Sequence, residues 1–584
     1  MADFSGILKT SAFLSLCRTL KQPQGVFPGR KLRRLKAGEI RILEKQGNIC
    51  RDWSLLCVAD NFSPENIYGS YFLGSCILGI FTKKTHKAGT ADVNAGIYFS
   101  TLNNAIVGDD ALIHRCAFVS RYIIDASACV MDSRLEGPEA STAFGNGTMI
   151  AAGIETGGRN VPAFYDLDFA IAQASARGEI PSAELEEFLA AYASDAKLSF
   201  GYAGKNCSIG SSYVCNSFIG PGVVLDGASR VADSTLFTET SPIYVGHGCI
   251  LDQTLVRPGC SFDTQAICTH SFFADCSGAS RQALINESYI GPNSHIGEGE
   301  VTSSFVGPFV GLHHQSLLIA AFWPGGKGNI GYGANLGSNH SSRSPDLELW
   351  PGEGMFFGLG CNIKYPADYS RSPYSIIATG VMTLPQKLEY PFSLITHQEK
   401  FLPEVPMGYN RLIPAWVLAF NFYTLWRSQL KFSQRNKTPH IPLETDPLHA
   451  GNITLMKDAA EKLASPVQRK DFYLPGDIPG LGKNVLFEED RVTAVKTYAW
   501  FIRFADLRLA CADKTCVKQA ADIQEYLAHL DTLYTMTLSS RTKDFTRGTR
   551  IIPDYAKTHD PAESDQLIID MKNFIAAEKL RFGV

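Results

Sequence analysis

The sequence predicts a β protein with α-helical additions whose middle part is a parallel β-helix, and two observations carry this prediction. Apolar residues recur six positions apart, as at Val107, Ile113 and Val119. Glycine often follows such an apolar residue directly, as at Gly108 and Gly220. Six residues suit one flat face of a triangular coil, so about eighteen residues are expected per turn, with the apolar side chain inside. The glycine is expected at a corner, where left-handed backbone is favoured.

The periodicity changes along the chain and divides it into segments. Leu185, Phe188 and Tyr192 follow a helical spacing and predict an inserted helical hairpin, and spacings such as Val495 to Ile502 predict helices near the C-terminus. The expected segments are a mixed N-terminal region (1–65), a first β-helix segment (66–160), the inserted hairpin (161–198), a main β-helix segment (199–395) with an irregular excursion (324–364), and a mostly α-helical C-terminal domain (396–584).

Composition narrows the class of protein. Lys and Arg (54) nearly balance Asp and Glu (58), which argues against a nucleic-acid partner. No apolar run is long enough to span a membrane. The 15 cysteines include no C-x-x-C pair, so we expect reduced thiols, no zinc site and a cytoplasmic protein.

Four stretches resemble an uncharacterised bacterial family of hexapeptide-repeat proteins. They are residues 51–53 (RDW), 155–159 (ETGGR), 333–340 (GANLGSNH) and 350–360 (WPGEGMFFGLG). The resemblance covers nearly the whole chain. It implies a left-handed parallel β-helix solenoid with a helical insert and a helical C-terminal domain, and it brings no known reaction.

A broader resemblance links residues 329–335 (NIGYGAN) to the N-I-G-x-G pattern of β-helix acyltransferases. It implies a histidine base, a CoA thioester as co-substrate, no tightly bound cofactor, and a homo-oligomer, with a trimer favoured. The N-terminal region lacks a G-x-G-T-R signature, so a pyrophosphorylase half is not expected.

Candidate catalytic residues lie in the excursion 324–364. His340 is the predicted general base, because an imidazole accepts a hydroxyl or amine proton near neutral pH. Glu353 or Asp346 is expected to orient its ring, while Asn339 and Asn335 donate hydrogen bonds to a carbonyl oxygen that gains charge. Alternatively, the asparagines occupy corners or form ladders, and the histidine is structural.

Two glycine-containing turns are candidate substrate-binding sites. Lys327, within residues 324–328 (PGGKG), can offer an ammonium to a phosphate, and the other interpretation is a flexible turn. Glu155 and Arg159 flank two glycines that can form an anion-binding nest, or else a sharp turn in which the two side chains pair. Arg343 and Lys364 complete the predicted substrate-binding set.

Adjacent histidines at His313 and His314 raise the question of a metal. In a strand they point to opposite sides, so at most one faces a given cleft. The histidine spacings are irregular at His247, His270, His295 and His313, and no H-x4-H is present, so no metal is predicted.

These observations favour a hexapeptide-repeat transferase that moves an acyl group from a CoA thioester to a sugar or sugar-nucleotide acceptor. A non-enzymatic binding or assembly scaffold is the alternative. A third hypothesis is a sugar-nucleotide-binding enzyme that uses no CoA and requires a diphosphate site at Lys327 or Arg159.

Overall fold

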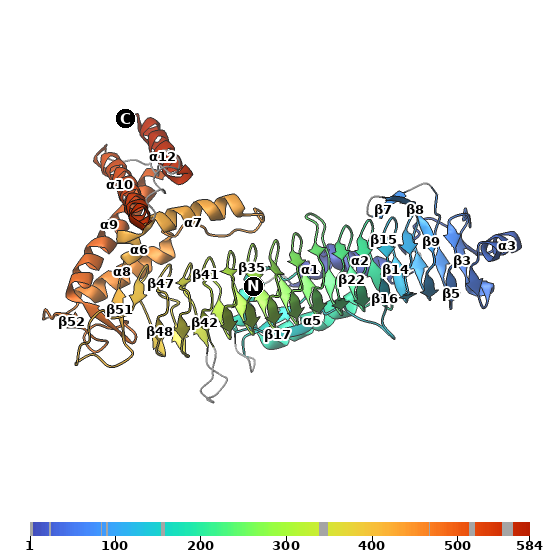
Figure 1. Ribbon diagram of the computed structural model, residues 1–584, viewed down its shortest axis with the longest axis horizontal. Helices are drawn as coiled ribbons and strands as arrows, with labels where there is room; N and C mark the ends of the chain where they lie inside the picture. The colour runs from blue at the N-terminus through green and yellow to red at the C-terminus, as the bar shows by residue number, and fades with distance from the viewer. Residues whose placement is uncertain are drawn as a thin grey trace. The chain divides into compact units, whose positions relative to one another are not determined.

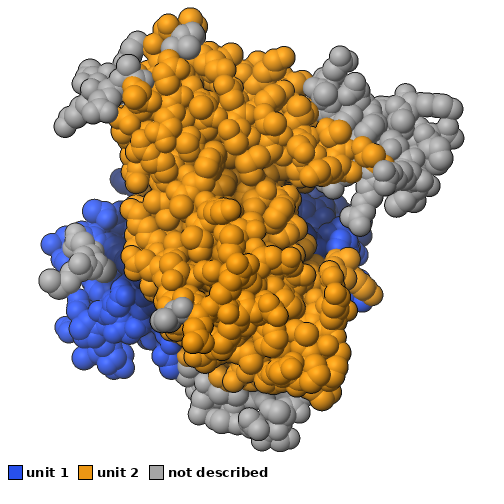
Figure 2. Space-filling model, turned by 90° about the vertical axis from the view of Figure 1, so that its left-hand side faces the viewer, with its two compact units in different colours: residues 1–324, 342–347 blue, residues 325–341, 348–584 orange. Residues whose placement is uncertain are grey.

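The computed structural model divides the chain into two compact units, which Figure 2 shows in different colours. Unit 1 comprises residues 1–324 with 342–347, and unit 2 comprises residues 325–341 with 348–584. The residues that the structure describes are 4–22, 25–82, 85–88, 91–153, 158–337, 348–466, 468–512, 520–551 and 565–583.

Unit 1 is built on a parallel β-helix, which confirms the predicted fold class (Figure 1). In one coil, β11 (Ile106–Val107) lies on face 1, β12 (Leu112–His114) on face 2 and β13 (Phe118–Ser120) on face 3. Each strand pairs in parallel with its equivalent in the next coil, β14 (Tyr122–Ile124), β15 (Cys129–Met131) or β16 (Arg134–Glu136). The hand of the helix stays a prediction.

The coils are shorter than expected. Val107, Ile113 and Val119 point inward from three successive faces and are fully buried. The next residue on face 1 is Ile124, which pairs with Val107. Two steps of six residues and one of five complete this turn, because the corner between faces 3 and 1 closes tightly through left-handed Arg121 (φ 49°).

The glycines that follow apolar residues are needed for a different reason from the one expected. Gly108 does not have left-handed backbone, which belongs instead to later residues such as Asp110 (φ 52°). A Cβ on Gly108 would lie 2.7 Å from the backbone nitrogen of Ala126, and one on Gly291 would lie 2.6 Å from the carbonyl carbon of Gly307. Neighbouring coils approach so closely here that no side chain fits.

A ladder of buried hydroxyls follows the corner between faces 3 and 1. The Ser234 hydroxyl donates to the carbonyl of Ala232 (2.6 Å) and accepts from the backbone N–H of Thr254 (3.0 Å). Ser288 repeats the arrangement by accepting from the N–H of Ser304 (3.1 Å). The ladder members are fully buried: Ser217, Ser234, Thr254, Ser271, Ser288 and Ser304. The corner therefore satisfies its backbone with neutral groups.

The insert begins before the expected helical hairpin. The chain leaves the coils after β16 and rejoins them at β19 (Gly201–Ala203). A β-hairpin of β17 (Thr148–Ala151) and β18 (Asn160–Ala163) comes first, so the predicted helical hairpin 161–198 starts with the end of a strand. Helices α4 (Phe169–Ala176) and α5 (Ser182–Ala196) follow, and Asp168 caps α4 by accepting from the N–H of Ile171.

The insert covers the outer surface of face 1. Tyr289 stacks on Phe272 (5.4 Å between ring centroids) and on Phe305 (4.7 Å), and all three rings are fully buried. Phe169 of the insert lies 6.4 Å from the Tyr289 ring. The N-terminal helices α1 (Phe4–Thr10) and α2 (Ala12–Leu20) join this layer, since Phe4 stacks on Phe188 (4.4 Å).

The coils begin earlier than residue 66. Strand β2 (Ile49–Cys50) pairs with β5 (Tyr71–Leu73), and β3 (Cys57–Ala59) pairs with β6 (Ile77–Leu78), both in parallel. On the other side of β3, β1 (Leu32–Arg34) pairs antiparallel. Helix α3 (Ala37–Lys45) lies between β1 and β2 in the chain.

Unit 2 continues with coils of its own, so most of segment 324–364 keeps the repeat. Strand β41 (Asn329–Ile330) pairs with β44 (Phe356–Phe357), and β42 (Asn335–Leu336) pairs with β45 (Asn362–Ile363). Partners in these pairs are 27 positions apart, whereas β44 and β47 (Ile376–Ile377) are 20 apart. The extra length falls at 338–347, outside the described residues.

An antiparallel pair ends the coils of unit 2. Strand β50 (Leu394–Thr396) pairs with β51 (Asn410–Ile413), which also pairs with β53 (Asn484–Phe487). The helices that follow are α6 (Trp416–Phe420), α7 (Phe422–Arg435), α8 (Ala450–Ala464), α9 (Glu488–Ala512), α10 (Ala520–Ile551) and α12 (Gln566–Phe582). In the described part of the chain, no helix has the length and apolar character needed to cross a bilayer.

Candidate functional site

Four of the predicted site residues lie outside the described residues: Glu155, Asn339, His340 and Arg343. Asp346, the other predicted orienting residue for His340, also lies outside them. Their roles stay predictions. The structure places the remaining five, which are Arg159, Lys327, Asn335, Glu353 and Lys364.

Lys327 and Glu353 meet in a buried ionic cluster of unit 2. The Lys327 side chain is only 5% exposed, and its ammonium lies 2.5 Å from Oε1 of Glu353. Oε2 of the same carboxylate accepts from Nε2 of His449 (2.9 Å) and from the amide of Asn452 (3.3 Å). The Tyr374 hydroxyl donates to Oε1 (3.2 Å). Both carboxylate oxygens are therefore occupied by groups of unit 2.

The pKa values of this cluster follow from its partners. Burial alone would raise the pKa of Glu353, but the hydrogen bond from His449 and the charge of Lys327 lower it to about 2. The hydrogen bond to Glu353 raises the pKa of His449. Because His449 and Asn452 lie at the start of α8 and Glu353 lies in the coils, the cluster joins this helix to the β-helix of unit 2.

Asn335, Lys364 and Arg159 do not join that cluster. Asn335 pairs in register with Asn362, and both are half-buried. The Lys364 side chain is exposed. Arg159 lies in unit 1, where its guanidinium covers the Phe322 ring (5.2 Å) and donates to the carbonyl of Ala176 (3.1 Å).

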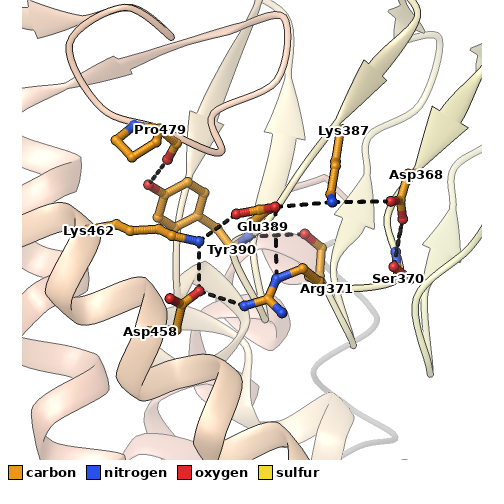
Figure 3. A network of polar contacts seen from close by, with 10 residues as sticks. Asp368, Ser370, Arg371, Lys387, Glu389, Tyr390, Asp458, Lys462 and Pro479 are labelled. Atoms are coloured by element: carbon orange, nitrogen blue, oxygen red, sulfur yellow. Dashed lines mark hydrogen bonds and ion pairs between the residues drawn. The ribbon is translucent and has the colours of Figure 1, made fainter.

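A second ionic network in unit 2, which the sequence did not suggest, fixes another part of α8 (Figure 3). Lys462 lies 2.5 Å from Glu389 and 2.7 Å from Asp458, and Arg371 lies 2.7 Å from Asp458. The hydrogen bond from Lys462 is the main cause that lowers the pKa of Glu389 and of Asp458. The charges in this network pair with one another, and the pairs attach α8 to the coils of unit 2.

Unit 1 holds an open cleft on the corner between faces 2 and 3, here called the corner cleft, with a volume of about 440 Å³. Its charged and aromatic lining consists of Arg115, Asp132, Arg134, Tyr213 and His247. Hydroxyl and small residues complete it: Ala117, Ser133, Ser211, Ser212, Gly227, Ala228 and Ser229. This size falls within the range of small-molecule sites, about 300–1,000 Å³.

Ion pairs orient the cations of the corner cleft. Arg115 lies 3.0 Å from Asp132, and Arg134 lies 2.6 Å from Glu136. The Tyr213 hydroxyl donates to Glu136 (2.8 Å), and this bond is the main cause that raises the pKa of Tyr213 to about 12. The cleft thus offers guanidinium groups, hydroxyls and an imidazole, which suit a polar or anionic ligand.

Sequence reasoning missed the corner cleft because its residues are far apart in the chain. They come together through the register: Met131 pairs with Gly210, and Gly210 with Asp226, so the residues that follow each strand stack on one corner. Writing the sequence out coil by coil would have aligned Asp132, Ser211 and Gly227.

No metal site was predicted, and in the described ranges no three His, Cys, Asp or Glu side chains gather as a metal ion would require. The described cysteines are free thiols, and burial raises the pKa of inward-pointing Cys268 and Cys260.

Comparison with protein families shows which family the chain belongs to. The model of a family described as "Domain of unknown function (DUF4954)" matches residues 32–345, more than half of the chain. This chain belongs to the DUF4954 family. The match takes in the corner cleft, since every residue that lines it lies between 115 and 247.

One relative is a Treponema pallidum (strain Nichols) protein described as "Uncharacterized protein". It is 27% identical over 482 residues, which cover 77% of this chain and 64% of that protein. The DUF4954 chain therefore spans less than two thirds of that relative's length.

Among solved structures, a Desulfovibrio desulfuricans G20 chain described as a "putative acetyltransferase" is similar over 75% of this chain and 94% of its own length. The identity is 10% and the TM-score 0.13.

Proposed function

We propose that this DUF4954 protein is a transferase that binds a polar acceptor in the corner cleft and acylates it from a CoA thioester. The supporting observation is the cleft itself, where His247 lies with Arg115, Arg134 and Tyr213 on the rigid coils of unit 1. Rigid elements hold reacting groups more accurately than mobile loops do.

The proposed reaction assigns a role to each group. His247 takes the proton from an acceptor hydroxyl or amine, whose oxygen or nitrogen attacks the thioester carbonyl. The C–S bond breaks, and the CoA thiolate takes up the proton and leaves as a thiol. Arg115 and Arg134 stabilise negative charge on the acceptor or on the carbonyl oxygen during the reaction. A sugar or sugar nucleotide supplies such an acceptor.

His340 is the rival general base, with Asn339 and Arg343 beside it in sequence. The proposal keeps these residues as a second candidate site, together with Asn335 and Lys364 as substrate contacts. The Lys327 side chain is 5% exposed and bound to Glu353, whereas the paired Arg115 and Arg134 side chains are 66% and 56% exposed. This difference in exposure favours the corner cleft over residues 324–364.

The test compares two histidine variants of the full chain. Wild type, His247→Ala and His340→Ala are assayed for free thiol released from acetyl-CoA with a panel of sugars and sugar nucleotides. Loss of turnover of at least tenfold in His247→Ala alone supports the corner cleft, and loss in His340→Ala alone moves the chemistry to the second candidate site. Thermal melting with CoA or sugar nucleotides detects binding, since about 2.7 kcal/mol is gained at 100 times the Kd.

An assembly scaffold is the second candidate function, and a specific observation favours it. Lys327 and Glu353, two of the predicted site residues, serve to attach α8. A chain that melts cleanly but neither binds nor turns over any of these compounds would support the scaffold. Binding of sugar nucleotides without CoA would support the third hypothesis. Sedimentation of the full chain tests the expected trimer.

A further inference from the structure

Polar side chains that the proposed function does not use surround Gly297 on face 2 of unit 1, and this position without a side chain is here called the recess. Here β32 (Gly278–Ser280), β35 (His295–Gly297) and β38 (Gly311–Leu312) lie side by side in parallel register. Ser280 pairs with Gly297, and His313 follows β38 directly. The recess lies two coils beyond His247 along the same corner of the β-helix.

Gly297 leaves open the space around which polar atoms of three coils converge. A Cβ at this position would lie 3.1 Å from Nη2 of Arg281, 3.3 Å from Nδ1 of His313 and 3.7 Å from Oγ of Ser280. Nε2 of His295 lies 2.9 Å from the same Ser280 oxygen. When His295 donates this bond, the Ser280 hydroxyl hydrogen is directed to a further acceptor.

Arg281 is held in place from its other side. Its Nε lies 3.0 Å from Oε1 of Glu298, whose Oε2 lies 2.9 Å from Nδ1 of His314. Glu298 is thereby engaged by Arg281 and His314, while Nη2 of Arg281 points to Gly297. The His295 and His313 rings lie 6.4 Å apart, and those of His313 and His314 lie 6.0 Å apart.

We propose that this recess, formed by Ser280, Arg281, His295, Gly297 and His313, binds a phosphate group. A guanidinium, a hydroxyl and two imidazoles are hydrogen-bond donors that match phosphate oxygens. Glu298, a carboxylate beside them, forms an ion pair with Arg281 and a hydrogen bond with His314. Asp263 pairs in register with Ser280, but its Oδ1 accepts from the N–H of Thr264 and lies toward Gly246. The cluster does not have the ligand set of a metal site.

The charges predict how binding depends on pH. With neutral imidazoles, Arg281 is balanced by Glu298, and Asp263 adds a negative charge beside Ser280. The recess therefore gains positive charge only when its imidazoles take up protons. Burial, followed by the nearness of His313 and Arg281, lowers the pKa of His295 in the free protein. A bound phosphate dianion opposes this effect, so binding of the dianion takes up protons. Its affinity strengthens as the pH falls, by up to about tenfold per pH unit for one proton.

The test measures binding of inorganic phosphate to the full chain by calorimetry at about pH 6 and pH 8. Gly297→Ala places a methyl group in the recess without backbone strain, because Gly297 does not have a positive φ. The methyl group would lie 3.1 Å from Nη2 of Arg281 and 3.3 Å from Nδ1 of His313, so both donors must shift. His313→Gln removes a protonatable donor. His270→Gln is the matched control, an exposed histidine at another corner of unit 1.

With affinities expressed for the phosphate dianion at each pH, we expect wild type and His270→Gln to bind more tightly at the lower pH. Gly297→Ala and His313→Gln should lose at least tenfold in affinity. The recess is overturned as a phosphate site if wild type fails to bind millimolar phosphate at either pH. It is equally overturned if both recess variants bind as wild type does. Titrations with a sugar phosphate and a nucleoside diphosphate then distinguish the source of the phosphate. Because phosphate binding is measured without turnover, the result is independent of the transferase test.

Discussion

The contacts between neighbouring coils of unit 1 and the contacts that attach helix α8 to the coils of unit 2 satisfy their buried polar groups in different ways. In unit 1, the hydroxyls of Ser234, Ser288 and their equivalents bridge neighbouring coils with neutral hydrogen bonds. In unit 2, buried or half-buried charges such as Lys327, Glu353 and Lys462 join the coils to α8. A neutral ladder repeats from coil to coil, whereas each ionic contact depends on a partner from one particular helix.

This difference predicts unequal costs of mutation. Removing one hydroxyl from the ladder leaves a single buried N–H without its acceptor, and the coils above and below still pair. Removing one member of a buried ion pair leaves an uncompensated charge in a medium that solvates it poorly. Attachment of α8 should therefore be the more sensitive feature.

The largest effect is expected for Glu353→Ala. This change leaves the ammonium of Lys327 buried without its carboxylate, and we expect a loss of about 3–5 kcal/mol in the free energy of unfolding. Denaturant unfolding, followed by circular dichroism, measures it. Glu404→Ala, at an exposed position of unit 2, is the control and should change stability by less than about 0.5 kcal/mol. If the two variants unfold alike, the cluster does not stabilise unit 2.

The same cluster predicts a dependence of stability on pH. The pKa of Glu353 falls from an ordinary value near 4.5 to about 2 on folding. Its contribution is present above the unfolded pKa and is lost as the pH falls toward 2, a loss of about 3 kcal/mol. His449, with a raised pKa, adds stability below its unfolded pKa that is lost as the pH rises through its folded pKa. Unfolding curves of wild type and His449→Gln across pH test this. Wild type should lose stability both at acid pH and as His449 loses its proton, whereas the variant should lack the second loss.

A smaller effect is expected in the hydroxyl ladder. Ser288→Ala removes the acceptor of the Ser304 N–H and should cost about 1–3 kcal/mol. Ser141→Ala, at an exposed position of unit 1, is the matched control. Equal unfolding midpoints for the two variants would show that the ladder contributes no stability.

The smallest effect is expected for an exposed ion pair. Arg18 and Asp195 lie 2.5 Å apart, but their side chains are 40% and 36% exposed. Arg18→Ala should change stability by less than about 1 kcal/mol, because solvent screens such pairs. A larger loss would mean that α2 depends on this contact for its attachment to the insert.

The fold of the coils could be predicted from the sequence, because the pattern that defines them is local and repeated. Val107, Ile113 and Val119 had to point inward from successive faces, and their spacing is visible without a structure. The reason for Gly108 was not visible, since it depends on how closely the next coil approaches. The length of a coil was also misjudged, because the tight corner at Arg121 takes one residue fewer than a regular repeat.

The contacts between distant polar residues could not be predicted from the sequence and are seen in the folded structure. Glu353 and His449 are almost a hundred positions apart, and nothing in the sequence near either residue indicates the contact. Arg115 and His247 line one cleft because several coils stack in register and the insert lies outside the coils. Periodicity reports which way a side chain points within its own coil. Which distant side chain it then meets depends on coil length, insert position and helix docking, and these are properties of the folded chain.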